Sequence, residues 1–539
     1  MLKHAVQGQL TEWVFQSGRP YADSFNEVEF DMRITTPSGR EQLVPGFWNG
    51  DQTWCVRYAS LECGLHHYET VCTDRANPDL HGRGGELEVH PYEGTQTLFR
   101  HGPIRVPVGG RTLEHADGTP FFWLADTWWD GLTTRLGWPG EFRMLLRDRV
   151  AKGFSVVQIV AGLLPDGPGL EPGTANEGGV PWEQEYRRPN PAYWDHADDR
   201  VGALVQAGVV PCIVGAWGFH VEEMGVERMK RHWRYILGRW GAYPVVWCLC
   251  GEVLMPLHGT YDRGGRMNVT EVAERRQRWS EVARYLRQID PYQRPVTVHP
   301  FGGPPEDGLG QLDDDALTDF TMLQTGHDPE SVRNHVQRTM EAVARGPGKP
   351  VLVGECMYES IIGRVWQDLV RFAFWSAMLS GTAGHSYGAN GVWQFATSPT
   401  SPVLGMGNWG GLTWEEAYEL PGAAQVGLGR RLLERFAWWE FCPRPKWVMP
   451  AASAERHGLF AAGIDRRVRI VYVPAAGLRP GGPYRVRAIE SGVKYAASWF
   501  DPRRGTEESA GSVVPDENGE WSILLPRGDR EDWVLVLTV

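Results

Sequence analysis

The feature that constrains this chain most is a regular alternation of short apolar segments with longer amphipathic ones between residues 121 and 440. The apolar segments have the length of buried strands, and the amphipathic ones have the period of helices, several closed by glycine. Strands that alternate with helices in this way form parallel β/α units. We count eight units and predict a (β/α)8 TIM barrel. Its strands begin at Phe121, Phe154, Val209, Val245, Pro295, Asp319, Pro350 and Gly384.

The regions on either side of this alternation have a different pattern. They contain short alternating segments interrupted by turn residues, which is typical of antiparallel β-sandwiches. A chain of 539 residues also exceeds what one hydrophobic core usually organises. We therefore predict an α/β protein with an amino-terminal β-sandwich (residues 1–108), a catalytic barrel (109–442) and a carboxy-terminal β-sandwich (443–539).

Charge and composition exclude several classes of function. A net charge of -12, without clustered Lys and Arg, argues against nucleic-acid binding. The sequence has no apolar run of about 18 residues that could cross a membrane and no signal-peptide pattern at its start, so we expect a cytoplasmic protein without a membrane partner. Neither a metal-binding motif nor a nucleotide-binding fingerprint occurs, so no metal and no cofactor is predicted. The oligomeric state stays open, a homo-oligomer included.

Two glutamates follow apolar strands at the end of a barrel where catalytic residues lie. Glu252 ends the fourth predicted strand, VVWCLCGE, and Glu355 ends the seventh, PVLVGE. Retaining cleavage of a glycosidic bond needs two carboxyl groups about 5 to 5.5 Å apart, one to protonate the leaving oxygen and one to attack the anomeric carbon. We predict Glu252 as the acid/base and Glu355 as the nucleophile. The alternative is that each glutamate only pairs with an arginine or caps a helix.

Further polar and aromatic residues stand at predicted strand ends and are candidates for sugar binding. A carboxylate accepts from two hydroxyl groups, and an indole covers the apolar face of a sugar. Each candidate also has a structural reading, because an aspartate can cap a helix, a tryptophan can fill the core and a histidine can orient a neighbour. The candidates are Asp126, Trp128, Trp129, Gln158, Trp217, His220, His299, Gln324, His327, Tyr358, His385, Tyr387 and Trp393.

Several motifs together resemble the apiosidase-like glycoside hydrolases. DGTPFFWLADTWWDGL, YPVVWCLCGE and KPVLVGECMYE look like the first, fourth and seventh barrel strands of that family, and VPGFWNGDQTWCVRYAS and SWFDPRRG look like its flanking sandwiches. The resemblance implies an exo-acting enzyme that releases a terminal sugar, with apiose or another pentofuranose favoured, from a plant glycoside or oligosaccharide. One residue departs from the pattern. The clan to which this family belongs commonly has Asn before the acid/base, whereas this chain has Gly251.

Other functions remain open at this stage. The chain could be a different retaining glycosidase, namely an α-L-arabinofuranosidase, a β-glucosidase or a β-galactosidase. It could also be a carbohydrate-binding protein without turnover, in which its 25 tryptophans serve for stacking.

Overall fold

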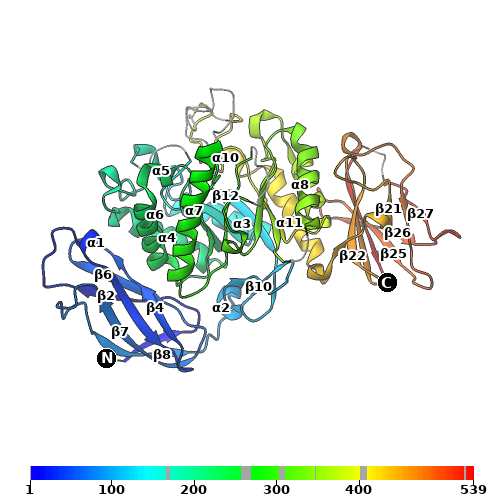
Figure 1. The fold of residues 1–539 in the computed structure, drawn as a ribbon. Helices are drawn as coiled ribbons and strands as arrows, with labels where there is room; N and C mark the ends of the chain where they lie inside the picture. The colour runs from blue at the N-terminus through cyan, green and yellow to red at the C-terminus, as the bar shows by residue number, and fades with distance from the viewer. Residues whose placement is uncertain are drawn as a thin grey trace.

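The fold was described from a computed structural model, which covers residues 2–165, 170–255, 269–302, 310–345, 348–400, 409–526 and 530–539. Two β-rich parts flank a central α/β part, with the amino terminus in one and the carboxyl terminus in the other (Figure 1). Among these residues, no helix is both long enough and apolar enough to span a bilayer.

The central part is the predicted barrel of eight parallel strands. Hydrogen bonds join the strands in the order β16-β15-β14-β13-β12-β19-β18-β17. Across the seam between β16 and β17, Asp319 N donates to Val296 O at 2.7 Å, so the barrel is nearly closed. The eight-strand prediction is confirmed. The strands are β12 Trp123–Trp128, β13 Val156–Val160, β14 Val210–Val214, β15 Val246–Cys248, β16 Val296–Thr297, β17 Thr321–Gln324, β18 Val351–Glu355 and β19 Gly384–Tyr387.

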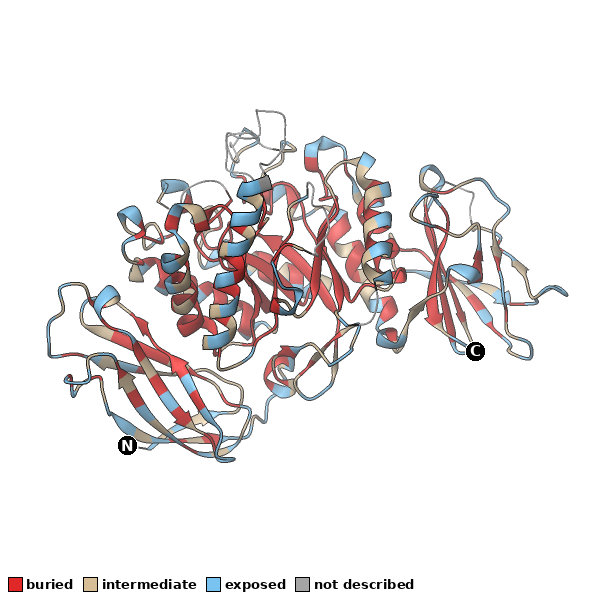
Figure 2. Ribbon diagram, in the orientation of Figure 1, coloured by how far each residue is buried: buried red, intermediate tan, exposed pale blue. Residues whose placement is uncertain are grey.

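Helices surround these strands, as the amphipathic segments predict. The strands are buried along almost their whole length, whereas the helices are buried on one side and exposed on the other (Figure 2). No α-helix lies between β16 and β17 among the described residues, which include only the short 3-10 helix Asp315–Leu317 there. The helices of this part are α3 Gly140–Lys152, α4 Pro191–Gln206, α5 His220–Met224, α6 Val226–Trp240, α7 Val269–Ile289, α8 Val332–Ala344, α9 Gln367–Leu379, α10 Trp414–Ala417 and α11 Pro421–Leu433.

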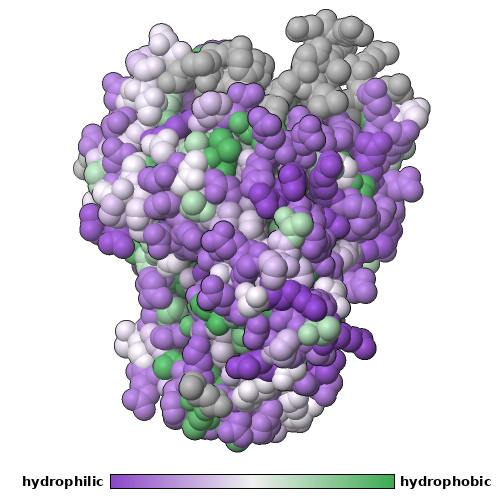
Figure 3. Space-filling view, turned by 90° about the vertical axis from the view of Figure 1, so that its left-hand side faces the viewer, coloured by the Kyte–Doolittle hydropathy of each residue, from purple (hydrophilic) through white to green (hydrophobic). Residues whose placement is uncertain are grey.

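The amino-terminal part consists of two sheets that share one apolar core. One sheet has the order β1-β8-β7-β3-β4 and the other β2-β6-β5. Met32 and Ile34 of the first sheet belong to the same core as Trp54 and Val56 of the second, which is how a sandwich buries its inner faces. Figure 3 shows the side of the molecule that lies on the left in Figure 1. The surface there is mostly hydrophilic, and the molecule narrows between the barrel above and these sheets below. The elements are β1 Leu2–Val6, β2 Thr11–Gln16, α1 Ser24–Glu27, β3 Phe30–Thr35, β4 Glu41–Pro45, β5 Phe47–Trp48, β6 Thr53–Tyr58, β7 Gly64–Cys72 and β8 Gly84–His90.

A connecting segment and a second pair of sheets complete the chain. The connection contains α2 Thr97–His101 and a small antiparallel sheet of β9 Ile104–Arg105, β10 Leu113–His115 and β11 Pro120–Phe121. The carboxy-terminal sheets have the orders β20-β22-β23-β28-β25-β26 and β21-β24-β27. Their strands are β20 Cys442–Pro443, β21 Val448–Met449, β22 Phe460–Ile464, β23 Val468–Val473, β24 Arg485–Val486, β25 Ala496–Phe500, β26 Glu507–Ser512, β27 Trp521–Ser522 and β28 Trp533–Thr538.

A buried ion pair joins the barrel to the carboxy-terminal sheets. Arg371 of α9 donates from Nε and Nη2 to the two carboxylate oxygens of Asp532, both at 2.8 Å. Tyr472 donates a further hydrogen bond to Asp532, and Arg371 Nη1 donates to Gln425. Both charges are therefore paired at a site where water does not reach them.

Replacing Asp532 by alanine should destabilise the protein, because it leaves the Arg371 guanidinium buried without its carboxylate. We expect a loss of about 3 to 5 kcal/mol in the free energy of unfolding. Urea unfolding followed by circular dichroism measures this loss. The matched control is Asp465→Ala, which removes an exposed carboxylate paired with Arg444 and should change the stability little. Equal losses in the two variants would contradict the role given to Asp532.

Candidate active site

The two predicted glutamates lie at the same end of the barrel, the carboxyl ends of its strands. Glu355 is the last residue of β18. β15, in contrast, ends at Cys248, so Glu252 lies four residues beyond the strand that was expected to contain it. Gly251 pairs with Trp217 in an isolated bridge, and Glu252 has a φ of 40°, an unusual value for a residue with a side chain. The backbone stays hydrogen-bonded to the neighbouring segments beyond β15, because Gly251 N donates to Ala216 O and Val253 N donates to His299 O.

The side-chain amide of Gln324 joins the two glutamates. Its Nε2 donates to Glu252 Oε1 and to Glu355 Oε1, both at 2.8 Å. These two carboxylate oxygens are consequently no more than twice 2.8 Å apart. Inverting glycosidases keep their carboxyl groups about 6.5 to 9.5 Å apart, which leaves room for a water molecule, whereas retaining enzymes keep them at about 5 to 5.5 Å.

Glu252 has the environment of a carboxyl group that keeps its proton. It is half-buried, and this burial and the charge of Glu355 together raise the pKa of Glu252 above its ordinary value. The hydrogen bond from Gln324 opposes the rise, since it stabilises the ionised form. A carboxyl group of raised pKa can serve as a general acid at neutral pH.

Glu355 has the opposite environment. It is only 5% exposed, and burial alone would raise its pKa. Two histidines outweigh that effect and hold the pKa of Glu355 well below its usual range: His299 Nε2 lies 3.1 Å from Oε2, and His327 Nε2 lies 2.8 Å from Oε1. The contact with Glu355 in turn raises the pKa of His327, although burial opposes this. Glu355 therefore stays ionised, as an attacking carboxylate must.

Aromatic rings border the pair on the Glu252 side. Trp217 Nε1 donates to Glu252 Oε2 at 3.3 Å, and its indole packs edge to face on Trp129 at 5.5 Å between ring centroids. Trp129 packs in the same manner on His299. A Cβ at position 251 would come within 2.2 Å of the Trp217 ring, so the indole takes the space that any side chain there would need. This explains why glycine precedes Glu252 in this chain.

Gln158 and Tyr358 lie next to these residues. Gln158 Nε2 donates to Gly354 O at 3.0 Å, which fixes the backbone just before Glu355. Its Oε1 is buried and has no hydrogen-bond partner in the part of the chain that the structure describes. Tyr358 is buried, packs against the ring of His327 and reaches Thr127 Oγ1 at 3.4 Å.

Two other predicted residues, Asp126 and Trp128, have partners within the fold. Asp126 is fully buried and accepts from Arg149 Nε at 2.6 Å and from Trp128 Nε1 at 2.8 Å, so its oxygens are occupied. Trp128 itself packs on Phe142 in the core. We leave both residues out of the proposed site, because a carboxylate paired with a buried arginine stabilises the fold and is closed to hydroxyl groups.

The three remaining strand-end residues that are fully buried have a similar role. His220 uses Nδ1 for Glu223 and Nε2 for Leu164 O. Tyr387 donates to Glu359 at 2.7 Å. Burial lowers the pKa of His385 to about 3, and its Nε2 lies 3.9 Å from Cys356 Sγ. These residues are also left out of the proposed site.

Trp393, Met255 and Trp409 are further residues of interest at or near the site. The N–H of Trp393 is buried and has no acceptor among the described residues, so Trp393 remains a candidate donor to substrate. Met255 and Trp409 were not expected at the site: Met255 Sδ accepts from Trp217 Nε1 at 3.2 Å, and Trp409 contacts the His327 ring. Only the Gly-rich and Trp-rich composition of the loop after Trp393 hinted at Trp409, and no sequence signal pointed to Met255.

Comparison with known proteins agrees with this geometry. A family model described as "Apiosidase-like, catalytic domain" matches residues 108–440. A domain of unknown function (DUF5060) matches residues 7–73, and a model described as a collagen-binding domain of a collagenase matches residues 452–538. No curated protein matches the sequence.

Solved structures of low sequence identity share the fold. A glycoside hydrolase with 24% identity has a TM-score of 0.67, with 81% of this chain and 97% of that chain covered. A glycoside hydrolase family 5 protein from Bacteroides vulgatus has the same identity and TM-score, with 81% and 93% covered. A second Bacteroides vulgatus protein, assigned as a glycoside hydrolase, has 17% identity and a TM-score of 0.66, and the match covers 99% of both chains.

Proposed function

Because this chain belongs to the apiosidase-like glycoside hydrolases, we propose that it is a retaining, exo-acting enzyme that releases a terminal pentofuranose such as apiose. The family description supports the sugar, and the family resemblance supports exo-cleavage. The short distance between Glu252 and Glu355, bridged by Gln324, is the observation that carries the retaining mechanism. We also propose domain boundaries at residues 1–108, 109–442 and 443–539, which the separate family matches support.

In the proposed first step, Glu355 attacks the anomeric carbon while Glu252 gives its proton to the leaving oxygen. The carbon–oxygen bond to the leaving group breaks as the ester bond to Glu355 forms. Esterification removes the negative charge of Glu355, and that charge is one of the causes of the raised pKa of Glu252. The pKa of Glu252 therefore falls, so Glu252 can take a proton from the water that hydrolyses the ester.

In this mechanism the pH dependence follows from the two shifted carboxyl groups. As the pH rises through the raised pKa of Glu252, the acid loses its proton and kcat/KM falls. As the pH falls, Glu355 stays ionised until below the usual range of a glutamate. We expect kcat/KM, measured from pH 3 to 9, to stay high on the acidic side to below the usual pKa of a glutamate. On the alkaline side kcat/KM should fall at a pH above that usual pKa. An alkaline limb near pH 4.5 would contradict the role of Glu252.

Gln324→Leu tests the bridging amide, since leucine has a similar size and no donor. The variant loses both hydrogen bonds of the amide, and one hydrogen bond to a charged group is worth about 1.5 to 3 kcal/mol, so we expect kcat/KM to fall at least about 10-fold. The alkaline limb should move to higher pH, because the Gln324 hydrogen bond lowers the pKa of Glu252. Gln337→Leu, on the exposed surface of α8, is the matched control. A fall in kcat/KM with an unmoved alkaline limb would argue against the bridge.

A panel of nitrophenyl glycosides tests the substrate class, with the apioside, α-L-arabinofuranoside, β-glucoside and β-galactoside compared at equal concentration. The proposal expects the apioside or another pentofuranoside to be hydrolysed fastest. Nuclear magnetic resonance of the first-formed sugar then reports its anomeric configuration. If the glucoside or galactoside is hydrolysed faster, the released sugar is not a pentofuranose, and that part of the proposal is wrong. A product of inverted configuration would exclude the retaining mechanism.

A further inference from the structure

A cavity of about 520 Å³ lies at the opposite end of the barrel from the two glutamates. Its barrel residues include Pro244 and Arg294, which come just before β15 and β16, at the amino ends of these strands. The amino-terminal sheets contribute Arg40 and Gln42, and the connecting segment contributes Arg105. Three parts of the chain thus enclose one cavity that has no role in the proposed mechanism.

Arg294 is the residue that makes this cavity unusual. It is only 7% exposed, and its Nε and Nη2 both donate to the single oxygen of Gly241, at 3.3 and 3.2 Å. Among the described residues, no carboxylate lies within ion-pair distance of it. Asp290 is the acidic group whose charge acts on Arg294, but its oxygens accept from Trp247 and from backbone N–H groups. The guanidinium carbon of Arg294 also lies 5.0 Å from the centroid of the Tyr292 ring. A buried guanidinium that makes no ion pair is costly, so an anion in the cavity would stabilise Arg294.

The other lining residues suit a sugar that bears this anion. Arg40 and Arg105 add positive charge at the exposed rim, although Arg105 is paired with Glu114. Among the described residues that line the cavity, Glu62 is the only acidic one, and it already accepts two hydrogen bonds from Ser38. Gln293 offers a neutral polar side chain to sugar hydroxyl groups at the exposed rim, whereas Gln42 and Ser60 already have hydrogen-bond partners within the protein. The apolar face of a sugar ring can contact the aliphatic side chains. The volume lies in the range of about 300 to 1,000 Å³ usual for small-molecule sites. The polar and aliphatic lining residues are Gln42, Ser60, Gln293, Leu61, Ile104 and Pro291.

We propose that this cavity binds a carboxylated monosaccharide unit, a hexuronate, with its carboxylate on Arg294. The unit is either the free sugar or the terminal residue of an acidic oligosaccharide. The site is separate from the glutamate pair and does not depend on the function proposed for it.

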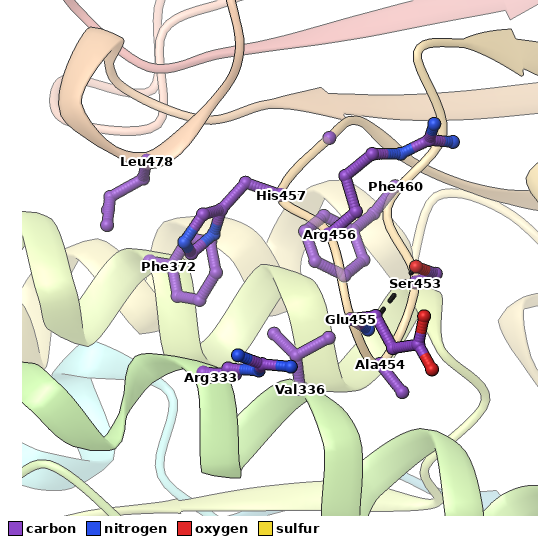
Figure 4. Close-up of a pocket in the computed structure, with 11 residues that line it drawn as sticks. Arg333, Val336, Phe372, Ser453, Ala454, Glu455, Arg456, His457, Phe460 and Leu478 are labelled. Atoms are coloured by element: carbon purple, nitrogen blue, oxygen red, sulfur yellow. Dashed lines mark hydrogen bonds between the residues drawn. The ribbon is translucent and has the colours of Figure 1, made fainter.

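A second pocket supplies the control. Figure 4 shows a smaller pocket, of about 200 Å³, between α8, α9 and the loop of residues 453–457 in the carboxy-terminal part. It also has basic side chains, Arg333, Arg456 and His457, but all three are exposed to solvent. Water stabilises these charges, so nothing there requires a bound anion.

Isothermal titration calorimetry of the full chain with D-galacturonate tests the proposal. We expect binding of galacturonate and none of D-galactose, which lacks the carboxylate. Arg294→Met should weaken binding at least 10-fold, and the rim variant Arg40→Gln/Arg105→Gln should weaken it several-fold while leaving the buried residues intact. Arg333→Gln, at the control pocket, and Glu355→Gln, at the glutamate pair, should bind like the wild type. If Arg294→Met does not fold, galacturonate binding by the rim variant alone tests the proposal.

Each other outcome changes or ends the proposal. Absence of galacturonate binding, or equal binding by the wild type and the rim variant, would overturn it. If inorganic phosphate binds as tightly as galacturonate, the cavity is a site for simple anions, and the proposal that it binds a sugar is wrong. Digalacturonate distinguishes the free sugar from the end of an acidic oligosaccharide. If digalacturonate binds more tightly than galacturonate, the ligand is the terminal residue of an oligosaccharide. If digalacturonate binds more weakly, the ligand is the free sugar.

Discussion

Glu355→Gln should reduce kcat/KM by about 10⁴-fold or more, because an amide cannot attack the anomeric carbon. Glutamine has nearly the same shape as glutamate and can still accept a hydrogen bond from His327, so we expect the fold to persist. Hydrolysis of the best nitrophenyl glycoside measures the loss, and a thermal unfolding curve checks the fold. The matched control is Glu330→Gln, an exposed residue paired with Arg364, which should keep full activity.

A rescue experiment identifies the attacked carboxylate more directly. In Glu355→Ala the side chain is shortened, and sodium azide can enter the space and attack the anomeric carbon itself. The leaving oxygen takes its proton from Glu252, and the product is a glycosyl azide of inverted configuration. Azide that leaves the variant inactive, or a residual activity within 100-fold of the wild type, would contradict the assignment of Glu355 as nucleophile.

Glu252→Gln should have an effect that depends on the leaving group. Glutamine cannot donate a proton, so substrates with alkyl leaving groups should lose about 10² to 10⁴-fold in kcat/KM. Dinitrophenyl leaving groups need little acid assistance, and their first step should be nearly unchanged. Single-turnover kinetics on the two classes of substrate separates these effects, and the alkaline limb assigned to Glu252 should disappear from the pH profile.

The control for this variant is again a glutamine substitution at an exposed site. Glu227 is exposed on the surface of α6 and forms an ion pair with Lys230, so Glu227→Gln should change neither class of substrate. Equal losses of Glu252→Gln on activated and unactivated substrates would argue that Glu252 positions the substrate and donates no proton. Addition of azide should restore turnover of the activated substrate with retained configuration, because azide replaces the water that Glu252 would activate.

Local patterns in the sequence were enough to predict the barrel and the residues that follow its strands. A buried parallel strand must be apolar, and the helix that returns the chain must be amphipathic, so β12 to β19 could be counted before their arrangement was known. Short or exposed strands lack such a pattern. β1, with no fully buried residue, and β26, which is mostly exposed, are examples.

Pairwise partners could not be predicted in the same way, because they come from distant parts of the chain. Asp126 and Gln324 both belong to barrel strands, yet Asp126 meets Arg149 of α3 whereas Gln324 meets the two glutamates. Nothing in the sequence around Asp126 or Gln324 indicates which of them meets an arginine and which meets the glutamates. The requirement for glycine at position 251 likewise depends on a distant residue, because the Trp217 ring occupies the space beside Gly251.

The sequence by itself determined the class of fold, the order of the strands along the chain and the two glutamates near the ends of strands four and seven, because buried segments have a periodic pattern of apolar residues. Only the tertiary structure decided which polar groups meet, and with them the opposite pKa shifts of Glu252 and Glu355. Those shifts depend on distances of a few ångströms between side chains from five different strands and loops. A linear pattern carries no information about such distances.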